Sequence, residues 1–188
     1  MSSLQKFHRR TQTSGPAPFA FTTIGGGDAT HGFWVATAGD GASKLIVAPL
    51  STESNQPWGS YNTTRNTIST TDGISNTNTL YAFGNNVASG HPAAYYCKTL
   101  TTGGYNTWYL PAKDELNNCW TNNAVTPFKT SDGFTTSFFW TSTESSASNA
   151  WCQYMGVGYG GNGVQFGAYG KKNMGGGGGR VRAVRRVV

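Results

Sequence analysis

Two apolar runs near the start of the chain flank a short glycine-rich turn, and this pattern predicts a β-hairpin. The runs cover residues 32–36 and 45–48, and Gly39-Asp40-Gly41 lies between them. A Gly-Asp-Gly segment between apolar runs is typical of a hairpin. Residues 51–87 are rich in Ser, Thr and Asn and show no sustained period, so we expect long ordered loops there.

Two segments in the middle of the chain have the spacing of short helices. The first lies within residues 90–100, where Pro92 suits the first helical position and the apolar side chains fall on one stripe. The second covers about residues 110–120, with Pro111 at its start and two acidic residues in its first turn. We therefore expect two short helices.

The chain after these helices has the alternation of β-strands. Residues 134–144 alternate weakly, residues 149–158 alternate clearly, and residues 180–187 place apolar side chains opposite arginines. Early strands, two short helices, long irregular loops and late strands predict an α+β domain with small antiparallel sheets. We expect the N- and C-terminal strands to be neighbours, residues 1–20 to form a polar arm, and residues 21–188 to form the domain.

The net charge of +6 arises entirely in the last 44 residues, because all eight acidic residues lie at or before Glu144. The basic residues beyond that point are Lys171, Lys172, Arg180, Arg182, Arg185 and Arg186. A basic patch can attract nucleic acid or an anionic surface. We prefer the alternative that several of these arginines pair with acids of the same fold.

Cysteine content and apolar runs limit the possible compartments and cofactors. The chain has no apolar run long enough for a bilayer span or a signal peptide, so we expect neither membrane insertion nor classical secretion. Cys97, Cys119 and Cys152 cannot all pair within one chain, and their spacing matches no zinc pattern. Reduced thiols or one optional bridge are the two interpretations, and we expect no metal and no cofactor.

Glycine supplies 12 of the 24 residues from Gly156 to Gly179. Each glycine inside a regular element costs roughly 0.5–1 kcal/mol relative to alanine, so something other than stability selected this composition. Aromatic residues and asparagines among the glycines are similar to the composition of antibody paratopes. A low-complexity loop without function is the alternative.

The alternation in residues 151–156 predicts a strand with an inward and an outward face. The inward face holds Trp151, Gln153 and Met155, and the outward face holds Cys152, Tyr154 and Gly156. Four tryptophans are expected to fill the core: Trp34, Trp108, Trp140 and Trp151.

Three blocks of sequence resemble a bacterial and viral family with a C-type-lectin-like fold, related to formylglycine-generating enzymes. "GGYNTWYLPAKDEL", "FFWTSTESSASNAW" and "RVRAVRRV" are similar to its Leu-Pro-x-x-x-Glu-Leu, Trp-Ser-Ser-Thr-Glu and Arg-Val-Arg-Ala-Val blocks. Upstream, "ASKLIVAPLSTESNQPWGS" resembles its Gly-Leu-Ile-x-Ala-Pro…Trp block, with Ser43-Lys44 where glycine is usual. The resemblance covers about residues 24–188 and implies that Glu115 and Glu144 meet Arg180 or Arg182.

One branch of this family comprises the variable proteins of diversity-generating retroelements, in which adenines near the end of the gene are randomised. Asn codons ending in C can then encode Gly, Tyr, Cys, Ser, Asp or Arg among others, but not Gln, Lys, Met, Trp or Glu. The excluded residues are Trp151, Gln153, Met155, Gln165, Lys171, Lys172 and Met174. The resemblance implies a variable region at about residues 150–188 and the ligand-binding positions Cys152, Tyr154, Gly156, Val157, Tyr159, Gly160, Gly161, Asn162, Phe166, Tyr169, Asn173, Gly175, Gly176, Gly177 and Gly178.

The resemblance implies a display protein, not an enzyme, that binds a protein or other macromolecular surface of unknown identity. The aromatic residues of the variable region would be anchors, and its asparagines would supply hydrogen bonds. We expect no nucleic-acid partner, and location on a virion or display through a partner is compatible with the sequence. A metal-free carbohydrate-binding adhesin is the first alternative, because the acidic triplets of calcium-dependent lectins are absent. A formylglycine-generating-type oxidase with Cys152 as its reactive thiol is the second.

Overall fold

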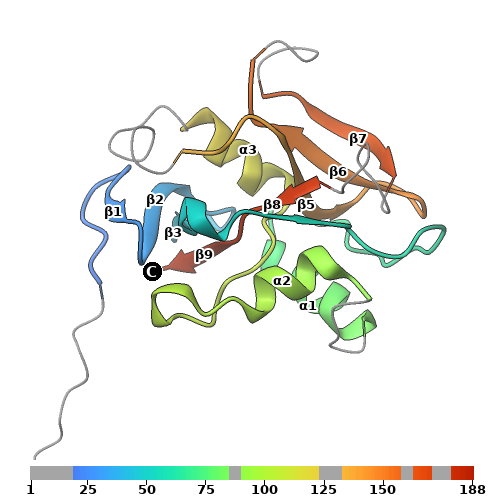
Figure 1. Cartoon of the computed structure of the whole chain (residues 1–188), viewed down its shortest axis with the longest axis horizontal. Coiled ribbons are helices and arrows are strands. Elements are labelled where there is room, and N and C mark those ends of the chain that lie inside the picture. Colours follow the sequence, from blue (N-terminus) through green and yellow to red (C-terminus); the bar gives the residue numbers. More distant parts are fainter. Residues whose placement is uncertain (1–18, 85–89, 123–132, 158–162, 171–178) are drawn as a thin grey trace, which may run out of the picture.

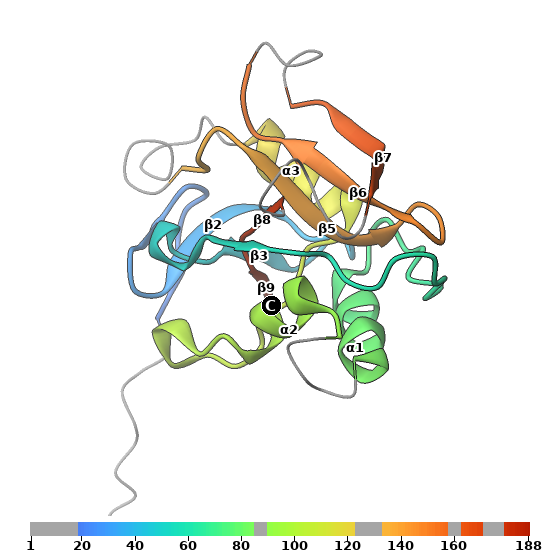
Figure 2. The ribbon, with the colours of Figure 1, turned by 45° about the vertical axis from the view of Figure 1, so that its right-hand side comes forward.

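The computed structural model describes residues 19–84, 90–122, 133–157, 163–170 and 179–188. Within these residues the chain forms two β-sheets and three α-helices, so the fold is mixed α+β as the sequence predicts. Helices α1 and α2 lie side by side on one side of the molecule, and α3 lies on the other (Figures 1 and 2).

The first sheet brings together the two ends of the described chain. Its strands are β1 (Gly27–Asp28), β2 (Gly32–Thr37), β3 (Lys44–Val47) and β9 (Val184–Val187), in that order and all antiparallel. The β2–β3 hairpin confirms the first prediction from the sequence. The β3–β9 pair confirms that the N- and C-terminal strands are neighbours.

The second sheet contains the strands that carry the predicted site. Its order is β4 (Ser54–Gln56), β8 (Gly179–Val181), β5 (Phe138–Glu144), β6 (Asn149–Tyr154) and β7 (Gln165–Gly170). Strands β5 and β8 are parallel, and the other pairs are antiparallel. The last sequence block therefore forms two strands, β8 and β9, that belong to different sheets.

Two of the three helices are those predicted from the sequence. Helix α2 covers Pro92–Thr99 with the expected proline in its first turn. Helix α3 covers Lys113–Thr121 and begins two residues after Pro111. Two short 3₁₀ turns, Leu50–Thr52 and Thr102–Gly104, complete the helical elements of the described residues.

Helix α1 (Gly73–Phe83) lies where the sequence predicts loops, so that prediction is wrong. Its N-terminus is capped by Asp72, whose carboxylate accepts a hydrogen bond from Ser75 N at 3.1 Å. Its buried side includes Asn76 and Thr77, and the Thr77 hydroxyl donates to the Leu110 carbonyl at 3.1 Å. A helix that buries polar side chains shows no apolar stripe, which explains why periodicity missed it.

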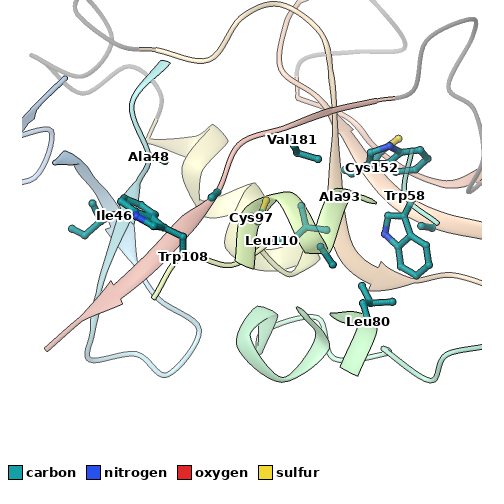
Figure 3. Close-up of a cluster of buried hydrophobic side chains, with 14 of the residues drawn as sticks. Ile46, Ala48, Trp58, Leu80, Ala93, Cys97, Trp108, Leu110, Cys152 and Val181 are labelled. Atoms are coloured by element: carbon teal, nitrogen blue, oxygen red, sulfur yellow. The ribbon is translucent and has the colours of Figure 1, made fainter. Parts of the chain in front are cut away.

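The largest core cluster lies between the sheets and helices α1 and α2 (Figure 3). Trp108 and Trp140 are fully buried in it as expected, and so is Trp58, whereas Trp34 and Trp151 are only partly buried. The Trp58 indole donates to Thr141 O at 2.7 Å, and the Trp140 indole donates to Gln56 O at 3.0 Å. These two bonds link β5 to the last residue of β4 and to the segment after it, and they satisfy the indole N–H of both tryptophans.

The start of the packed domain lies slightly before the predicted boundary. Phe21 is buried in the main cluster, and Phe19 packs against it. Residues 1–18, most of the predicted arm, lie outside the described residues.

A buried arginine marks the point where the chain passes from β8 in one sheet to β9 in the other. The Arg182 side chain is fully buried, its Nε donates to Ala48 O at 2.7 Å, and its Nη1 lies 3.4 Å from Glu53 Oε1. Glu53 is itself buried, lies 3.6 Å from Arg180 Nη1, and accepts a 2.6 Å hydrogen bond from the Thr135 hydroxyl. The acid at the centre of this cluster is thus Glu53.

The predicted acidic partners of Arg180 and Arg182 therefore need correction. Glu115 is buried and binds Arg186 instead, with Nη2 at 2.9 Å, while the Tyr109 hydroxyl donates to it at 2.8 Å. Burial raises the pKa of the Glu115 carboxyl. Glu144 accepts hydrogen bonds from the backbone N–H groups of residues 65–66.

Arg185 is also buried but has a different environment. Its guanidinium carbon lies 3.6 Å from the centre of the Tyr105 ring and 5.3–5.4 Å from those of Phe21 and Trp108. Within the described residues its Nε has no hydrogen-bond partner and no carboxylate forms an ion pair with it. Burial lowers the pKa of this guanidinium, so cation–π contacts provide its main compensation.

We predict that two matched substitutions differ strongly in their effect on stability. Arg182→Met leaves the buried Glu53 carboxylate without its fully buried partner and should lower the free energy of unfolding by about 3–5 kcal/mol. Arg185→Met exchanges a buried cation for an apolar chain and should change that free energy by less than about 1 kcal/mol in either direction. Urea denaturation followed by tryptophan fluorescence measures both, and equal losses would contradict the distinction.

Candidate functional site

Strands β6 and β7 and the segments that follow them contain the predicted ligand-binding positions. Cys152, Tyr154, Gly156, Val157 and Phe166 are described. Outside the described residues lie Tyr159, Gly160, Gly161, Asn162, Asn173, Gly175, Gly176, Gly177, Gly178 and the side chain of Tyr169. The described part of the site can therefore be built from the first five positions and their neighbours.

Three aromatic rings from three strands form the centre of this region, and we call Phe138, Tyr154 and Phe166 the aromatic platform. Phe138 lies directly opposite Tyr154 across the β5–β6 pair. Its ring centre is 5.0 Å from that of Tyr154 and 5.7 Å from that of Phe166. All three side chains are partly exposed, and such spacing is typical of interacting aromatic pairs.

Val157 follows the end of β6 and is the most exposed described residue of the predicted site. Its exposed fraction is 72%. A valine at this exposure gains little from burial, so the fold does not require a particular side chain there. Among the predicted positions that the structure describes, Tyr154, Val157 and Phe166 reach the surface.

The prediction that Cys152 faces outward is wrong. Cys152 is fully buried in the tryptophan-rich core together with Ala150 (Figure 3). The inward prediction for Gln153 and Met155 is confirmed, because both are buried on the side of α3. In its middle, at Cys152 and Gln153, β6 is thus covered on both faces, and alternation alone cannot recognise such a strand.

Gly156 is also buried, which contradicts its predicted outward position. A Cβ added there would lie 2.7 Å from the Thr136 methyl group and 2.8 Å from the Tyr154 ring. Larger side chains at position 156 would push against the aromatic platform itself. The fold therefore constrains this position, and we remove it and Cys152 from the candidate site.

The β6–β7 hairpin is fixed to helix α3 through two glutamines. The Gln153 amide donates to Asn117 Oδ1 and to Gly163 O, both at 2.9 Å. The Gln165 amide donates to Lys113 O at 2.7 Å. These bonds hold the loop end of the hairpin, where Gln153 lies opposite Gln165, in one geometry, while the platform lies on its other face.

Gly163, at the start of the return into β7, is required by the backbone and by its neighbour. Its φ is +64°, in the left-handed region that favours glycine. A Cβ at this position would overlap the indole of Trp120. Sequence reasoning did not single out Gly163, Asn117 or Phe138, and only the strand register and the α3 contacts show their roles.

The described charged side chains near the C-terminus are in ion pairs or buried, and the thiols are buried. Arg180 and Arg182 contact Glu53, and Arg186 contacts Glu115, Asp40 and Asp72, which confirms the preferred interpretation of the basic C-terminal residues. The thiols of Cys97, Cys119 and Cys152 are free, and burial raises the pKa of each. The described residues contain no group of three potential metal ligands.

No model of a protein family matches the chain, and a search of curated proteins finds no significant match. Among the described residues, no helix has the length and apolar character needed to cross a membrane.

Thiol labelling tests the corrected position of Cys152. We predict that Ellman's reagent at pH 8 leaves all three thiols of the folded protein unmodified for many minutes, because they are buried and protonated. Denaturant should make all of them react. Rapid labelling of one thiol that disappears in Cys152→Ala would return Cys152 to the surface.

A pair of glycine substitutions tests the anchor at Gly163. Gly163→Ala and Gly41→Ala both place a side chain at positive φ, but a Cβ at Gly41 meets nothing within 4 Å. We predict that Gly41→Ala lowers the free energy of unfolding by about 1–2 kcal/mol, because of backbone strain alone. Gly163→Ala should lower the free energy of unfolding by about 1–3 kcal/mol more than Gly41→Ala, because its Cβ would overlap the Trp120 indole. Similar melting temperatures for the two variants would show that Trp120 moves aside without cost.

Proposed function

We propose that the chain is a ligand-binding display protein whose C-terminal surface is diversified by retroelement mutagenesis to bind varied macromolecular targets. The described part of this surface is the aromatic platform together with Val157. The remaining predicted positions that lie outside the described residues would complete it. No catalytic step is proposed.

The observation that carries the proposal is the separation of two kinds of residue on one hairpin. Gln153 and Gln165, which adenine mutagenesis cannot produce, make the hydrogen bonds that fix the hairpin to α3. Of the residues that it can produce, Tyr154, Val157 and Phe166 are partly or fully exposed, whereas Cys152 and Gly156 are buried. Variation at the second set would leave the anchoring contacts intact.

The chemistry of the surface also supports binding to macromolecules. Tyrosine and phenylalanine bring large contact areas with few rotatable bonds, which is why they dominate paratopes and interface hot spots.

We further propose a C-type-lectin-like fold. Its support is the resemblance in sequence and the sheet that joins the β2–β3 hairpin to β9.

Metal-free carbohydrate binding is the second candidate, and the partly exposed Tyr154 and Phe166 rings favour it, since sugars stack on such rings.

The oxidase alternative loses support. A reactive cysteine needs an accessible thiolate, whereas Cys152 is buried and its pKa is raised. Nucleic-acid binding loses support because Arg180, Arg182 and Arg186 contact acids of the same chain.

The DNA beside the gene provides the most direct test. We expect an imperfect repeat of the segment that encodes about residues 150–188, which differs from it only at adenines, and a reverse-transcriptase gene nearby. Sequencing of the flanking DNA decides the matter. Repeats that differ at all four bases equally, or no repeat at all, would contradict diversification.

Substitution at surface and anchor positions tests the separation of roles. Tyr154→Ala and Val157→Asp should each lower the free energy of unfolding by less than about 1 kcal/mol. Gln153→Leu should cost about 1–3 kcal/mol, because Asn117 Oδ1 and Gly163 O lose their donor. Thermal unfolding measures all three. A variant at Tyr154 or Val157 as unstable as Gln153→Leu would argue against a tolerant surface.

A further inference from the structure

We infer that Arg185 is the anion-binding group of a site for a carboxylate, and that Phe21 in the segment before β1 is the cover of this site. The ligand would carry an apolar or aromatic group next to its carboxylate. Neither residue is among the predicted ligand-binding positions, so the inference goes beyond the proposed function and does not rest on it.

The missing acidic partner of Arg185 is the first argument. Arg180 and Arg182 contact Glu53, and Arg186 contacts three acids. Arg185 is only 5% exposed, and within the described residues its Nε has no hydrogen-bond partner and no carboxylate forms an ion pair with it. A buried charge without a counter-charge is costly, and a buried donor without an acceptor requires an explanation.

Aromatic rings surround the guanidinium group but supply no negative charge. The guanidinium carbon lies 3.6 Å from the centre of the Tyr105 ring, 5.3 Å from that of Phe21 and 5.4 Å from that of Trp108. Such rings attract a cation through their faces and carry no net charge of their own. A leucine or methionine would fill the same space without a buried charge, so packing alone does not explain an arginine at this position.

The surroundings of Arg185 indicate the chemistry of the ligand. A guanidinium group presents parallel N–H donors that match the two oxygens of a carboxylate. A single negative charge would neutralise Arg185, whereas a phosphate dianion would bring a second charge that must also leave water. The neighbouring rings favour an apolar or aromatic group beside the carboxylate.

The segment that carries Phe21 is held to the domain by few contacts. Residues 19–22 belong to no helix or strand. Lys44 Nζ donates to the Phe21 carbonyl at 2.8 Å, and Phe19 stacks on His31 with ring centres 4.5 Å apart. Displacement of this segment leaves the pairing of β3 with β9 intact, so a ligand can take the place of the buried ring.

Phenylacetate joins a carboxylate to an aromatic ring and is the probe, and phenylacetamide is its uncharged counterpart. In Phe21→Ala the ring of the probe fills the space of the missing side chain, and we expect phenylacetate to bind at least about fivefold more tightly than phenylacetamide. Addition of Arg185→Met to the same chain should abolish this preference. The unmodified chain should show the preference at weaker affinity, because Phe21 must first be displaced. NMR titration measures each Kd.

Phe83→Ala is the matched control, because it also removes a phenylalanine ring that lies next to an arginine. The Phe83 ring is 52% exposed, and the guanidinium carbon of Arg65 lies 4.9 Å from its centre. Unlike Arg185, Arg65 donates through its Nε, to His91 Nε2 at 3.0 Å. Phe83→Ala should therefore bind both compounds as the unmodified chain does.

A second variant protects the test against misfolding. Phe21→Leu keeps an apolar side chain in the core and removes only the ring, so it should fold and still prefer phenylacetate. Near-ultraviolet circular dichroism checks the fold of each variant. Equal affinities for the two compounds in the folded chains, or a preference that survives Arg185→Met, would overturn the inference.

A peptide distinguishes two sources of the carboxylate. Gly-Gly-Phe with a free C-terminus should bind Phe21→Ala more tightly than its amidated form. Tighter binding of the free peptide than of phenylacetate would identify a protein C-terminus as the ligand, and weaker binding would identify a small aromatic acid. Absence of the adenine-marked repeat beside the gene would refute the proposed function and leave this inference unaffected.

Discussion

The fold depends on the burial of Arg182 at the point where the chain leaves one sheet and enters the other. Strands β8 and β9 are separated only by Arg182 and Ala183, yet they belong to different sheets. The guanidinium group binds the Ala48 carbonyl and the Glu53 carboxylate. A buried charge of this kind is tolerated only with a partner in good geometry. The pair therefore fixes β3, β4 and the crossover relative to one another.

This arrangement supplies stability away from the outer edge of the second sheet. The sheet order places β4 and β8, with Glu53 nearby, on one side of β5, and β6 and β7 on the other. Core tryptophans and the Glu115–Arg186 contact add further links between elements. Side chains on the β6–β7 face can then change without loss of these interactions, provided that the two glutamines still hold the hairpin to α3.

Local patterns predicted the local elements, while long-range contacts could not be read from them. The β2–β3 hairpin and helix α2 followed from turn residues, proline and apolar spacing. Helix α1 was not predicted, because its buried side includes the polar residues Asn76 and Thr77 and therefore shows no apolar stripe. Cys152 was misplaced because alternation cannot reveal a strand that is covered on both faces. The acid for Arg182 was misassigned because Glu53 lies 129 positions away along the chain.

The described glycines near the C-terminus differ in how far the fold constrains them, and this affects the interpretation of their abundance. Gly163 has a positive φ beside Trp120, and Gly156 has no room for a Cβ beside Thr136. Gly167 is similarly close to the Trp151 ring, at 2.9 Å from an added Cβ. Gly163 is required by its backbone conformation, and at Gly156 and Gly167 an added Cβ would force the neighbouring side chains to shift. Under the proposed diversification, a count of glycines would therefore overstate the number of freely varied positions. Among the described residues, the proposed diversification would act at Tyr154, Val157 and Phe166, while the Phe138 ring, which contacts the first and the last of these, packs against the core.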